Sequence, residues 1–247
     1  MPWAVVTGAS GKLGRVFACA LAAHGYSLIL HCHRNTKAVS ELCAELAAMG
    51  CAAQWLQADL TQPEERAAFI RESFTADTSV LINSAACFFK GNMAAASAEE
   101  LARVFALNTF APYDLITNFA RVCAPDSLAI NILDTKIFHD ASGYAAYSLS
   151  KKSLADITRM AAREFAPGLR VHALALACVS PTEDASAAEL SARAPLGHAG
   201  REEDIVYALD FFLQAGGVTG QCLSIDGGLV TSYFSLPSSA DTGRIPP

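Results

Sequence analysis

TGASGKLG, the stretch Thr7–Gly14, lies between a short apolar segment and a helical pattern, and it decides the expected fold. Residues 3–7 before it have the composition of a β-strand, and residues 15–24 after it have the apolar spacing of an α-helix. Small residues at such a junction let the backbone approach a pyrophosphate, whose charge the helix N-terminus favours. Glycines also form ordinary tight turns, so the position at the first strand-to-helix junction is what favours a dinucleotide site. The turn residues expected to bind it are Gly8, Ser10, Lys12, Leu13 and Gly14.

Short β-type segments alternate with longer helical segments along the rest of the chain. Right-handed crossovers place such a series in a parallel sheet with helices on both faces. The sequence therefore predicts one α/β domain over residues 1–234, a doubly wound, Rossmann-type sheet of seven parallel strands. The expected strands are residues 3–7, 26–32, 51–58, 80–83, 128–133, 170–177 and 221–225.

Several helix ends carry capping signals. Gly25 and Gly50 suit the left-handed residue that follows the end of a helix. Two pairs, Thr61 with Glu64 and Ser97 with Glu100, have the spacing of a capping box, in which each side chain satisfies a free backbone donor. Residues 99–121 are then expected to form one long helix, and residues 147–165 another.

Two segments lack a clear pattern. Residues 178–200 are rich in Ala, Ser and Pro and only weakly periodic, so we expect a mobile lid or a short helical excursion. Residues 235–247 contain Ser, Gly and Pro, and we expect a poorly ordered tail.

The composition excludes several classes of protein. With 52% hydrophobic and 17% charged residues the chain has enough apolar material for a folded domain. The formal net charge of −6 leaves no basic excess for binding nucleic acid or an anionic membrane. No stretch reaches the roughly 18 uncharged apolar residues that a membrane span needs, and the sequence shows no signal-peptide pattern. We therefore expect a cytoplasmic protein. The eight cysteines form no CxxC pair and do not cluster with histidine, which predicts reduced thiols and no metal site.

The end of the second strand selects between the two nicotinamide dinucleotides. An acidic residue there would bind the free adenosine ribose of NAD and repel the 2′-phosphate of NADP. The chain has no such residue and instead carries His33, Arg34 and Asn35, with Lys12 and Arg15 available from the glycine turn. The alternative is that Arg34 is a solvated loop residue. The missing carboxylate favours NADP(H) as the cofactor.

Tyr147 and Lys151 have YxxxK spacing, which places both side chains on one face of a helix. This spacing arises by chance often enough to be indicative only, but it follows TGxxxxxG, Asp59-Leu60 and Asn83-Ser84-Ala85 in order. Together these motifs resemble the short-chain dehydrogenase/reductase family from Trp3 to about Gly228. The resemblance implies a homotetramer with the two long helices between subunits. It also implies catalysis by Asn108, Tyr147 and Lys151, with cofactor contacts from Asp59, Leu60, Asn83, Ser84, Ala85, Tyr147 and Lys151.

One departure from the family pattern narrows the resemblance. The family has a serine about 13 residues before the tyrosine, and this chain has Asp134 there. That aspartate, the Lys-Leu-Gly end of the turn and the strand end His-Cys-His-Arg together resemble the pteridine reductase branch. In that branch an aromatic ring stacks on a flat pterin, and the resemblance implies this role for Phe88. Tyr144 is either a second substrate contact or packing at the start of the helix. The family's Pro-Gly pair after the sixth strand is replaced by Leu176-Ala177, which alters the nicotinamide and substrate pocket.

The chemistry of these residue types supports a reductase. A neighbouring ammonium favours the phenolate of a tyrosine, so Lys151 is expected to bring Tyr147 into acid-base range and to hold the nicotinamide ribose. Tyr147 then delivers the proton. Asp134 follows the fifth strand and could pair with a ring nitrogen or an amino-pyrimidine edge, or could simply cap the turn before Thr135. Phe88 could equally be core packing.

The leading hypothesis is NADPH-dependent reduction of a small molecule, a pterin or dihydropterin, by hydride transfer with proton delivery from Tyr147 and Asp134. The first alternative is a carbonyl reductase acting on a 3-oxoacyl thioester, in which Asp134 is a tolerated substitution. An alternative from another class is a catalytically idle NADP-binding sensor, because a cofactor site does not by itself prove chemistry. The presence of Asn108, Tyr147 and Lys151 argues against it.

Overall fold

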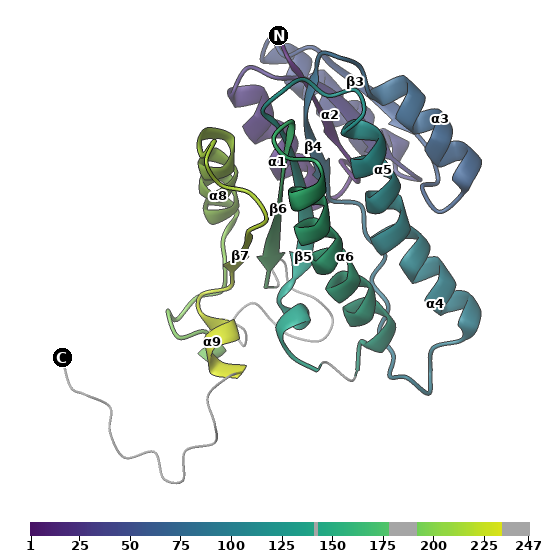
Figure 1. Ribbon diagram of the computed structural model, residues 1–247, viewed down its shortest axis with the longest axis vertical. Helices are drawn as coiled ribbons and strands as arrows, with labels where there is room; N and C mark the ends of the chain where they lie inside the picture. Colours follow the sequence, from purple (N-terminus) through teal and green to yellow (C-terminus); the bar gives the residue numbers. More distant parts are fainter. Residues whose placement is uncertain (141–142, 178–191, 234–247) are drawn as a thin grey trace, which may run out of the picture.

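The computed structural model describes residues 1–140, 143–177 and 192–233. Within these residues seven parallel strands form one sheet in the order β3-β2-β1-β4-β5-β6-β7 (Figure 1). The strand order reverses between β1 and β4, which confirms the doubly wound fold. The strands are β1 (Trp3–Val6), β2 (Ser27–Cys32), β3 (Ala53–Gln57), β4 (Thr78–Asn83), β5 (Ser127–Asp134), β6 (Leu169–Leu176) and β7 (Cys222–Ile225).

Helices cover both faces of the sheet, as predicted, because the inner strands are apolar on both sides. One face is covered by α1, α2 and α8, whose Phe17 and Phe212 are fully buried, and the other by α3, α5 and α6, with Phe69 and Phe119 in the core. Burial of each such ring stabilises the fold by about 1.5–3 kcal/mol. The helices are α1 (Lys12–Ala23), α2 (Thr36–Ala48), α3 (Pro63–Ser73), α4 (Ala98–Phe105), α5 (Ala111–Phe119), α6 (Ala145–Glu164), α8 (Glu202–Gln214) and α9 (Leu229–Tyr233).

The predicted long helix is present but not uniform. It begins at the capping box of Ser97 and Glu100, where Glu100 N donates to Ser97 Oγ at 3.1 Å. A π-helical turn, η1 (Ala106–Phe110), then separates α4 from α5. The expectation of one regular helix is therefore wrong in its middle. Such π-turns often accompany functional sites, and this one contains Asn108.

The predicted capping box of Thr61 and Glu64 is wrong. Helix α3 begins at Pro63, after Gln62, whose side chain makes no capping bond. Proline suits the first helical position because its missing N–H has no intrahelical partner there. Thr61 Oγ1 instead donates to Asp59 Oδ1 at 2.7 Å.

The predicted glycine caps are confirmed. Gly25 follows α1 with φ of 80°, and Gly50 follows α2 with φ of 82°. This left-handed region strains side chains with a Cβ atom, so glycine ends each helix at that point.

The predicted tail, residues 235–247, and most of the segment 178–200 lie outside the described residues. Among the described residues, no helix has the length and apolar character needed to cross a membrane.

Candidate active site

Thr7 joins the two central strands at the point where the strand order reverses. Its backbone N donates to Ile82 O at 2.9 Å, and its hydroxyl accepts from Ser84 N and Ala85 N at 3.0 Å each. Thr7 is itself almost fully buried. The segment after β4 is therefore fixed against the glycine turn, at the edge of the sheet where ligands bind in open α/β folds.

The glycine turn packs too tightly for side chains at two of its positions. Gly8 has φ of 68°, and a Cβ atom there would lie 2.8 Å from Ala85 Cα. A Cβ atom on Gly14 would overlap Gly8 O and Ala9 Cα, so its absence lets α1 start directly against the turn. Helix α1 has no side-chain cap and no acidic residue in its first turn. Its N-terminal backbone donors therefore suit a phosphate.

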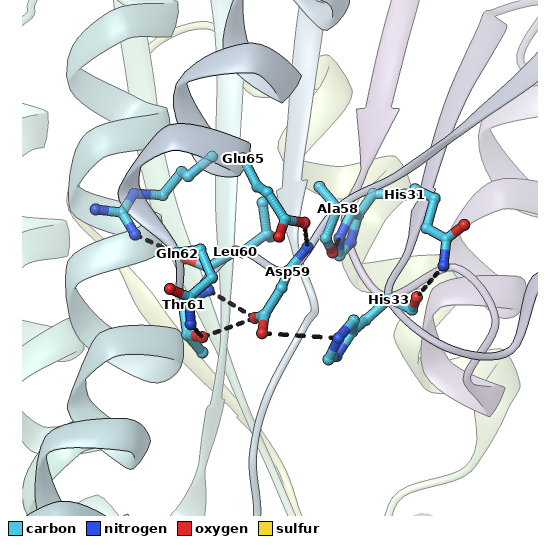
Figure 2. Close-up of polar contacts among 10 residues, drawn as sticks. His31, His33, Ala58, Asp59, Leu60, Thr61, Gln62 and Glu65 are labelled. Carbon is cyan, nitrogen blue, oxygen red and sulfur yellow. Dashed lines mark hydrogen bonds and ion pairs between the residues drawn. The ribbon is translucent and has the colours of Figure 1, made fainter.

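The side chain of His31 contacts the backbone of this turn and stabilises it, a role that the sequence did not reveal. Its Nδ1 accepts from Gly8 N at 3.1 Å and its Nε2 contacts Ala58 O at 3.0 Å. These partners require a neutral ring with its proton on Nε2. Burial lowers the pKa of His31 to about 4, so the ring stays neutral near pH 7. Figure 2 shows His31 directed at Ala58.

A cleft of about 610 Å³ opens beside the turn, a size suited to a dinucleotide. Arg103 of α4 and Leu107 of η1 also line it. Sequence reasoning missed both, because no motif shows that this helix crosses the crevice. The predicted cofactor residues that line the cleft are Gly8, Ser10, Lys12, Leu13, Gly14, His33, Arg34, Asn35, Asp59, Leu60, Ser84 and Ala85.

Asn83 was also expected to contact the cofactor, but the structure places its side chain inside the sheet. Asn83 Nδ2 donates to Asn131 Oδ1 at 2.9 Å, and Asn131 Nδ2 donates to Thr158 Oγ1 at 2.9 Å. All three residues are buried. This chain of hydrogen bonds joins β4, β5 and α6 beneath the cleft and so holds the ends of these strands in register.

The part of the cleft that follows β2 and β3 combines one acidic and two basic groups, Asp59 with His33 and Arg34. Asp59 Oδ1 accepts from the backbone N and the hydroxyl of Thr61, at 3.0 and 2.7 Å, and Asp59 Oδ2 lies 3.7 Å from His33 Nε2 (Figure 2). Burial alone would raise the pKa of Asp59, but the Thr61 bonds and the nearby His33 and Arg34 lower it. The carboxylate is thus charged and oriented, with Arg34 beside it on the cleft wall.

Two basic residues near the turn form ion pairs with glutamates of other helices. Lys12 Nζ lies 2.7 Å from Glu202 of α8, and Arg15 pairs with Glu45 of α2. Both are exposed ion pairs, so a bound phosphate would compete with these carboxylates for the two side chains. Asn35 likewise caps α2 through its side chain, which accepts from Ala38 N at 3.2 Å. Arg34 is left as the main basic candidate on this wall.

The π-helical turn connects the cleft to the YxxxK helix through Asn108. Asn108 is fully buried; its Oδ1 accepts from Cys87 N at 2.8 Å and its Nδ2 donates to Ser150 Oγ at 3.0 Å. Ser150 Oγ in turn donates to Tyr147 O at 2.7 Å. Cys87 lines the cleft, so Asn108 positions the wall of the cleft and the tyrosine together.

Tyr147, Lys151 and Asp134 meet at the carboxyl end of β5, as the sequence predicts. Tyr147 Oη donates to Asp134 Oδ2 at 3.3 Å. Lys151 Nζ donates to Ile132 O at 2.7 Å and lies 6.0 Å from the centre of the Tyr147 ring. Tyr147 and Lys151 are 7% and 3% exposed, so both head groups act in a largely dry environment.

The electrostatics of this cluster differ from the expectation. Burial, followed by the charge of Asp134, raises the pKa of Tyr147 well above its usual value. Burial lowers the pKa of Lys151 to about 8. The expected lowering of the tyrosine pKa by Lys151 is therefore wrong, because desolvation and the carboxylate dominate. Tyr147 keeps its proton near pH 7, which suits the donor in a reduction.

Asp134 has the capping role that was one of the two alternatives, and it also contacts Tyr147. Its Oδ1 accepts from Lys136 N at 2.8 Å and so caps the short 3-10 helix η2 (Thr135–Phe138). Its Oδ2 faces Tyr147 Oη. The carboxylate is therefore fixed by the turn at one oxygen and available to the tyrosine at the other.

The rings of Phe88, Tyr144 and Tyr147 lie beside the Asp134 carboxylate and form an aromatic wall. The Phe88 ring lies 4.8 Å from the Tyr147 ring and 5.1 Å from the Tyr144 ring, centre to centre. The loop that carries Phe88 is held in place because Gly91 N donates to Gly143 O at 2.8 Å. Phe88 is 48% exposed, so the alternative of core packing is wrong. Lys136, which the sequence did not single out, lies over the Tyr144 ring at 4.9 Å.

Comparison with known proteins agrees with this geometry. The family model described as Enoyl-(Acyl carrier protein) reductase matches residues 8–230. Pteridine reductase 1 of Leishmania tarentolae is 29% identical over 92% of this chain and 96% of that protein. A 3-oxoacyl-[acyl-carrier-protein] reductase of Synechocystis is 27% identical over 92% and 96% of the two chains. FolM alternative dihydrofolate reductase 1 from Brucella canis, complexed with NADP, superposes with a TM-score of 0.88 at 25% identity, over 97% of this chain and 98% of that chain.

The matched residues include the glycine turn, the helix of Asn108 and the pair of Tyr147 and Lys151. The fold that carries them has the strand order of a dinucleotide-binding sheet. Tyr147 and Lys151 do not line its cleft, but Asn108 connects the cleft wall at Cys87 to the helix of Tyr147. The chain therefore belongs to the short-chain dehydrogenase/reductase family and is an NAD(P)-dependent reductase.

Proposed function

We propose that this reductase uses NADPH to reduce a pterin or dihydropterin. The observation that carries the proposal is the carboxylate of Asp134, 3.3 Å from Tyr147 Oη and beside the exposed ring of Phe88. A flat heterocycle with ring nitrogens and amino groups fits a carboxylate next to an aromatic face. A ketone needs only a neutral hydroxyl donor to its developing oxyanion. The similarity to pteridine reductase 1 supports the same choice.

Three residues of the chain have separate roles in the proposed reaction. NADPH, when bound, supplies a hydride to the carbon of a C=N bond. Tyr147 holds the matching proton at Oη and transfers it to the nitrogen, so the double bond becomes a single bond with one hydrogen on each atom. Asp134 orients the phenol in the free enzyme through the 3.3 Å contact. Lys151 is held by Ile132 O, and in this proposal it donates to the nicotinamide ribose.

The second candidate is reduction of a 3-oxoacyl thioester, favoured by the similarity to the Synechocystis reductase. The two are separated by NADPH oxidation with 7,8-dihydrobiopterin and with an acetoacetyl thioester. We expect kcat/KM for the pterin to exceed that for the thioester by at least about tenfold. A reversed order would replace the pterin proposal by the thioester alternative.

Arg34→Ala should raise KM for NADPH about tenfold and leave KM for NADH nearly unchanged. Arg34 lines the cleft beyond β2, whose end carries no acidic residue, and in this proposal it binds the 2′-phosphate. Losing a charge-assisted hydrogen bond costs about 1.5–3 kcal/mol. Steady-state kinetics with both cofactors measure the difference, and the exposed Lys37→Ala serves as a control cation on α2. Equal effects of Arg34→Ala on NADPH and NADH would remove Arg34 from the phosphate site.

kcat/KM for NADPH should fall as the pH rises above about 8. Lys151 has a pKa of about 8, so its ammonium is present below this pH and is lost above it, together with its charged bond to the ribose. Tyr147 has a pKa well above its usual value and does not titrate in this range. Lys151→Arg should abolish this limb of the pH profile, because a guanidinium stays protonated. An unchanged limb in that variant would assign the titration to another group.

The predicted homotetramer stays a prediction. In support, the faces of α5 and α6 expose Tyr113 and Met160, at 54% and 66%. A groove of about 140 Å³ lies between these helices and is lined by Ile116, Ile157 and Phe165. We propose that a second copy of the chain covers this surface.

A further inference from the structure

Arg66 of α3 is a nearly buried cation behind one wall of the cleft, and no sequence motif includes it. Its side chain is 11% exposed. Its Nε donates to Asp114 Oδ2 of α5 at 2.7 Å, and its Nη1 donates to the backbone O of Leu60 at 2.7 Å. Arg66 therefore connects α5 to the turn that follows β3.

The turn of Asp59, Leu60 and Thr61 forms part of the cleft wall, and α3 supplies contacts that fix it. Glu65 Oε2 accepts from Asp59 N at 2.6 Å, on the exposed side of the turn (Figure 2). Leu60 is only 1% exposed, so water has little access to its backbone. A buried carbonyl that loses its donor costs free energy, so the position of Leu60 depends on the guanidinium of Arg66.

The shape of the guanidinium explains why both contacts form together. Its donors lie in one rigid plane, so the bond from Nε to Asp114 fixes the direction in which Nη1 points. Asp114 lies in the first turn of α5, where the helix dipole favours a carboxylate. Asp114 thus directs the second bond of Arg66 at Leu60 O.

The same turn lies next to the end of β2. Asp59 Oδ2 is 3.7 Å from His33 Nε2, and β2 pairs with β3 as far as Cys32 and Gln57. In dinucleotide-binding sheets the residues at the end of β2 contact the adenosine ribose. A dinucleotide in this cleft would therefore have its adenosine half beside Asp59 and Leu60.

We propose that Arg66 is a positioning residue for the cofactor, which holds the turn of residues 59–61, through Leu60 O, where the adenosine half of the dinucleotide binds. Asp114 acts through Arg66. The inference goes beyond the proposed function, because it requires an NAD(P)-dependent reductase and applies to a pterin or a thioester substrate alike. The turn contains none of the groups that carry out the reduction, so its displacement should weaken cofactor binding and leave the chemical step unchanged.

Arg66→Met keeps an unbranched side chain and removes both donors. It should raise Kd for NADPH and for NADH alike, each about tenfold, in fluorescence titrations. Kd for 2′,5′-ADP, which contains only the adenosine half, should rise by about the same factor when this ligand displaces NADPH. With whichever substrate the wild type reduces, kcat at saturating NADPH should stay within about twofold of the wild-type value.

Asp114→Asn tests whether Asp114 acts through Arg66. The amide keeps an acceptor for Nε and removes the charge, so Kd for NADPH should rise about threefold. In the Arg66→Met background the same substitution should add nothing, because the contact that it weakens is already absent. Additive effects of the two substitutions would separate Asp114 from the turn and overturn this part of the inference.

Ile70→Ala is the matched control for the stability of α3. Ile70 lies on the same helix and packs against the apolar core. Its truncation should lower the melting temperature and leave Kd for NADPH within about twofold of the wild-type value. The inference is overturned if Arg66→Met leaves Kd for NADPH unchanged, if Ile70→Ala raises it as much, or if Arg66→Met weakens NADPH but not 2′,5′-ADP. Each of these results leaves the choice between pterin and thioester untouched, because that choice rests on the comparison of substrates.

Discussion

Tyr147→Phe should lower kcat about a thousandfold while leaving the affinity for NADPH nearly unchanged. The phenylalanine ring keeps the packing against Phe88, at 4.8 Å between ring centres, and removes only the hydroxyl. General acid catalysis contributes roughly a hundredfold to ten-thousandfold to the rate of such a step. Because the pKa of Tyr147 is raised by burial and by Asp134, the wild-type phenol carries this proton throughout the neutral range. Turnover at saturating NADPH and fluorescence titration of NADPH measure the two effects separately.

Tyr144→Phe is the matched control, because it removes a hydroxyl from the neighbouring ring on the same wall. Tyr144 precedes α6 and contacts Phe88, but the hydrogen bond to Asp134 comes from Tyr147. The control should therefore lose less than about tenfold in kcat. Equal losses in the two variants would contradict the assignment of Tyr147 as the proton donor.

Asp134→Ser should lower kcat/KM for a dihydropterin about a hundredfold, and should leave any activity on an acetoacetyl thioester unchanged or improved. The serine hydroxyl can still donate to the oxyanion of a ketone, but it lacks the negative charge that pairs with the amino groups of a pterin. Asp134→Asn should also lose most pterin activity, since an amide lacks the negative charge that pairs with the pterin amino groups and that accepts from the Tyr147 hydroxyl. The measurement is kcat/KM for both substrates in the wild type and in the two variants.

These two substitutions isolate the carboxylate from the capping role of Asp134. Serine and asparagine both accept hydrogen bonds at helix N-termini, so the bond from Lys136 N can form in either variant. An unchanged melting temperature would confirm that η2 is intact. Wild-type rates with dihydropterin in both variants would show that Asp134 only caps the turn, and would favour the thioester alternative.

The local patterns that the sequence predicted correctly are those that depend on neighbouring residues. The alternation of strands and helices, the glycine caps at Gly25 and Gly50 and the capping box at Ser97 each follow from backbone and side-chain preferences within a few residues. The capping box at Thr61 failed for a local reason as well. Pro63 moved the helix start, and Thr61 turned to Asp59 instead.

Contacts between distant segments were harder to predict. Lys12 and Arg15 have the charge and position of phosphate ligands, but Glu202 and Glu45 reach them from α8 and α2. Asn83 follows the family pattern of a cofactor contact, yet its side chain donates a hydrogen bond to Asn131 on the next strand. Each of these partners is more than 25 residues away in the chain, where no periodicity connects them.

The sequence by itself determined the fold class, the position of the dinucleotide turn and the meeting of Asp134, Tyr147 and Lys151, because strand order and helical spacing bring these residues to one edge of the sheet. Only the tertiary structure decided their electrostatics. Burial and the charge of Asp134 raise the pKa of Tyr147, so it keeps its proton, and burial lowers the pKa of Lys151. Both shifts depend on what packs around each group, because desolvation does. The same packing laid Lys136 over the rings of Tyr144 and Phe88, beyond the reach of any sequence pattern.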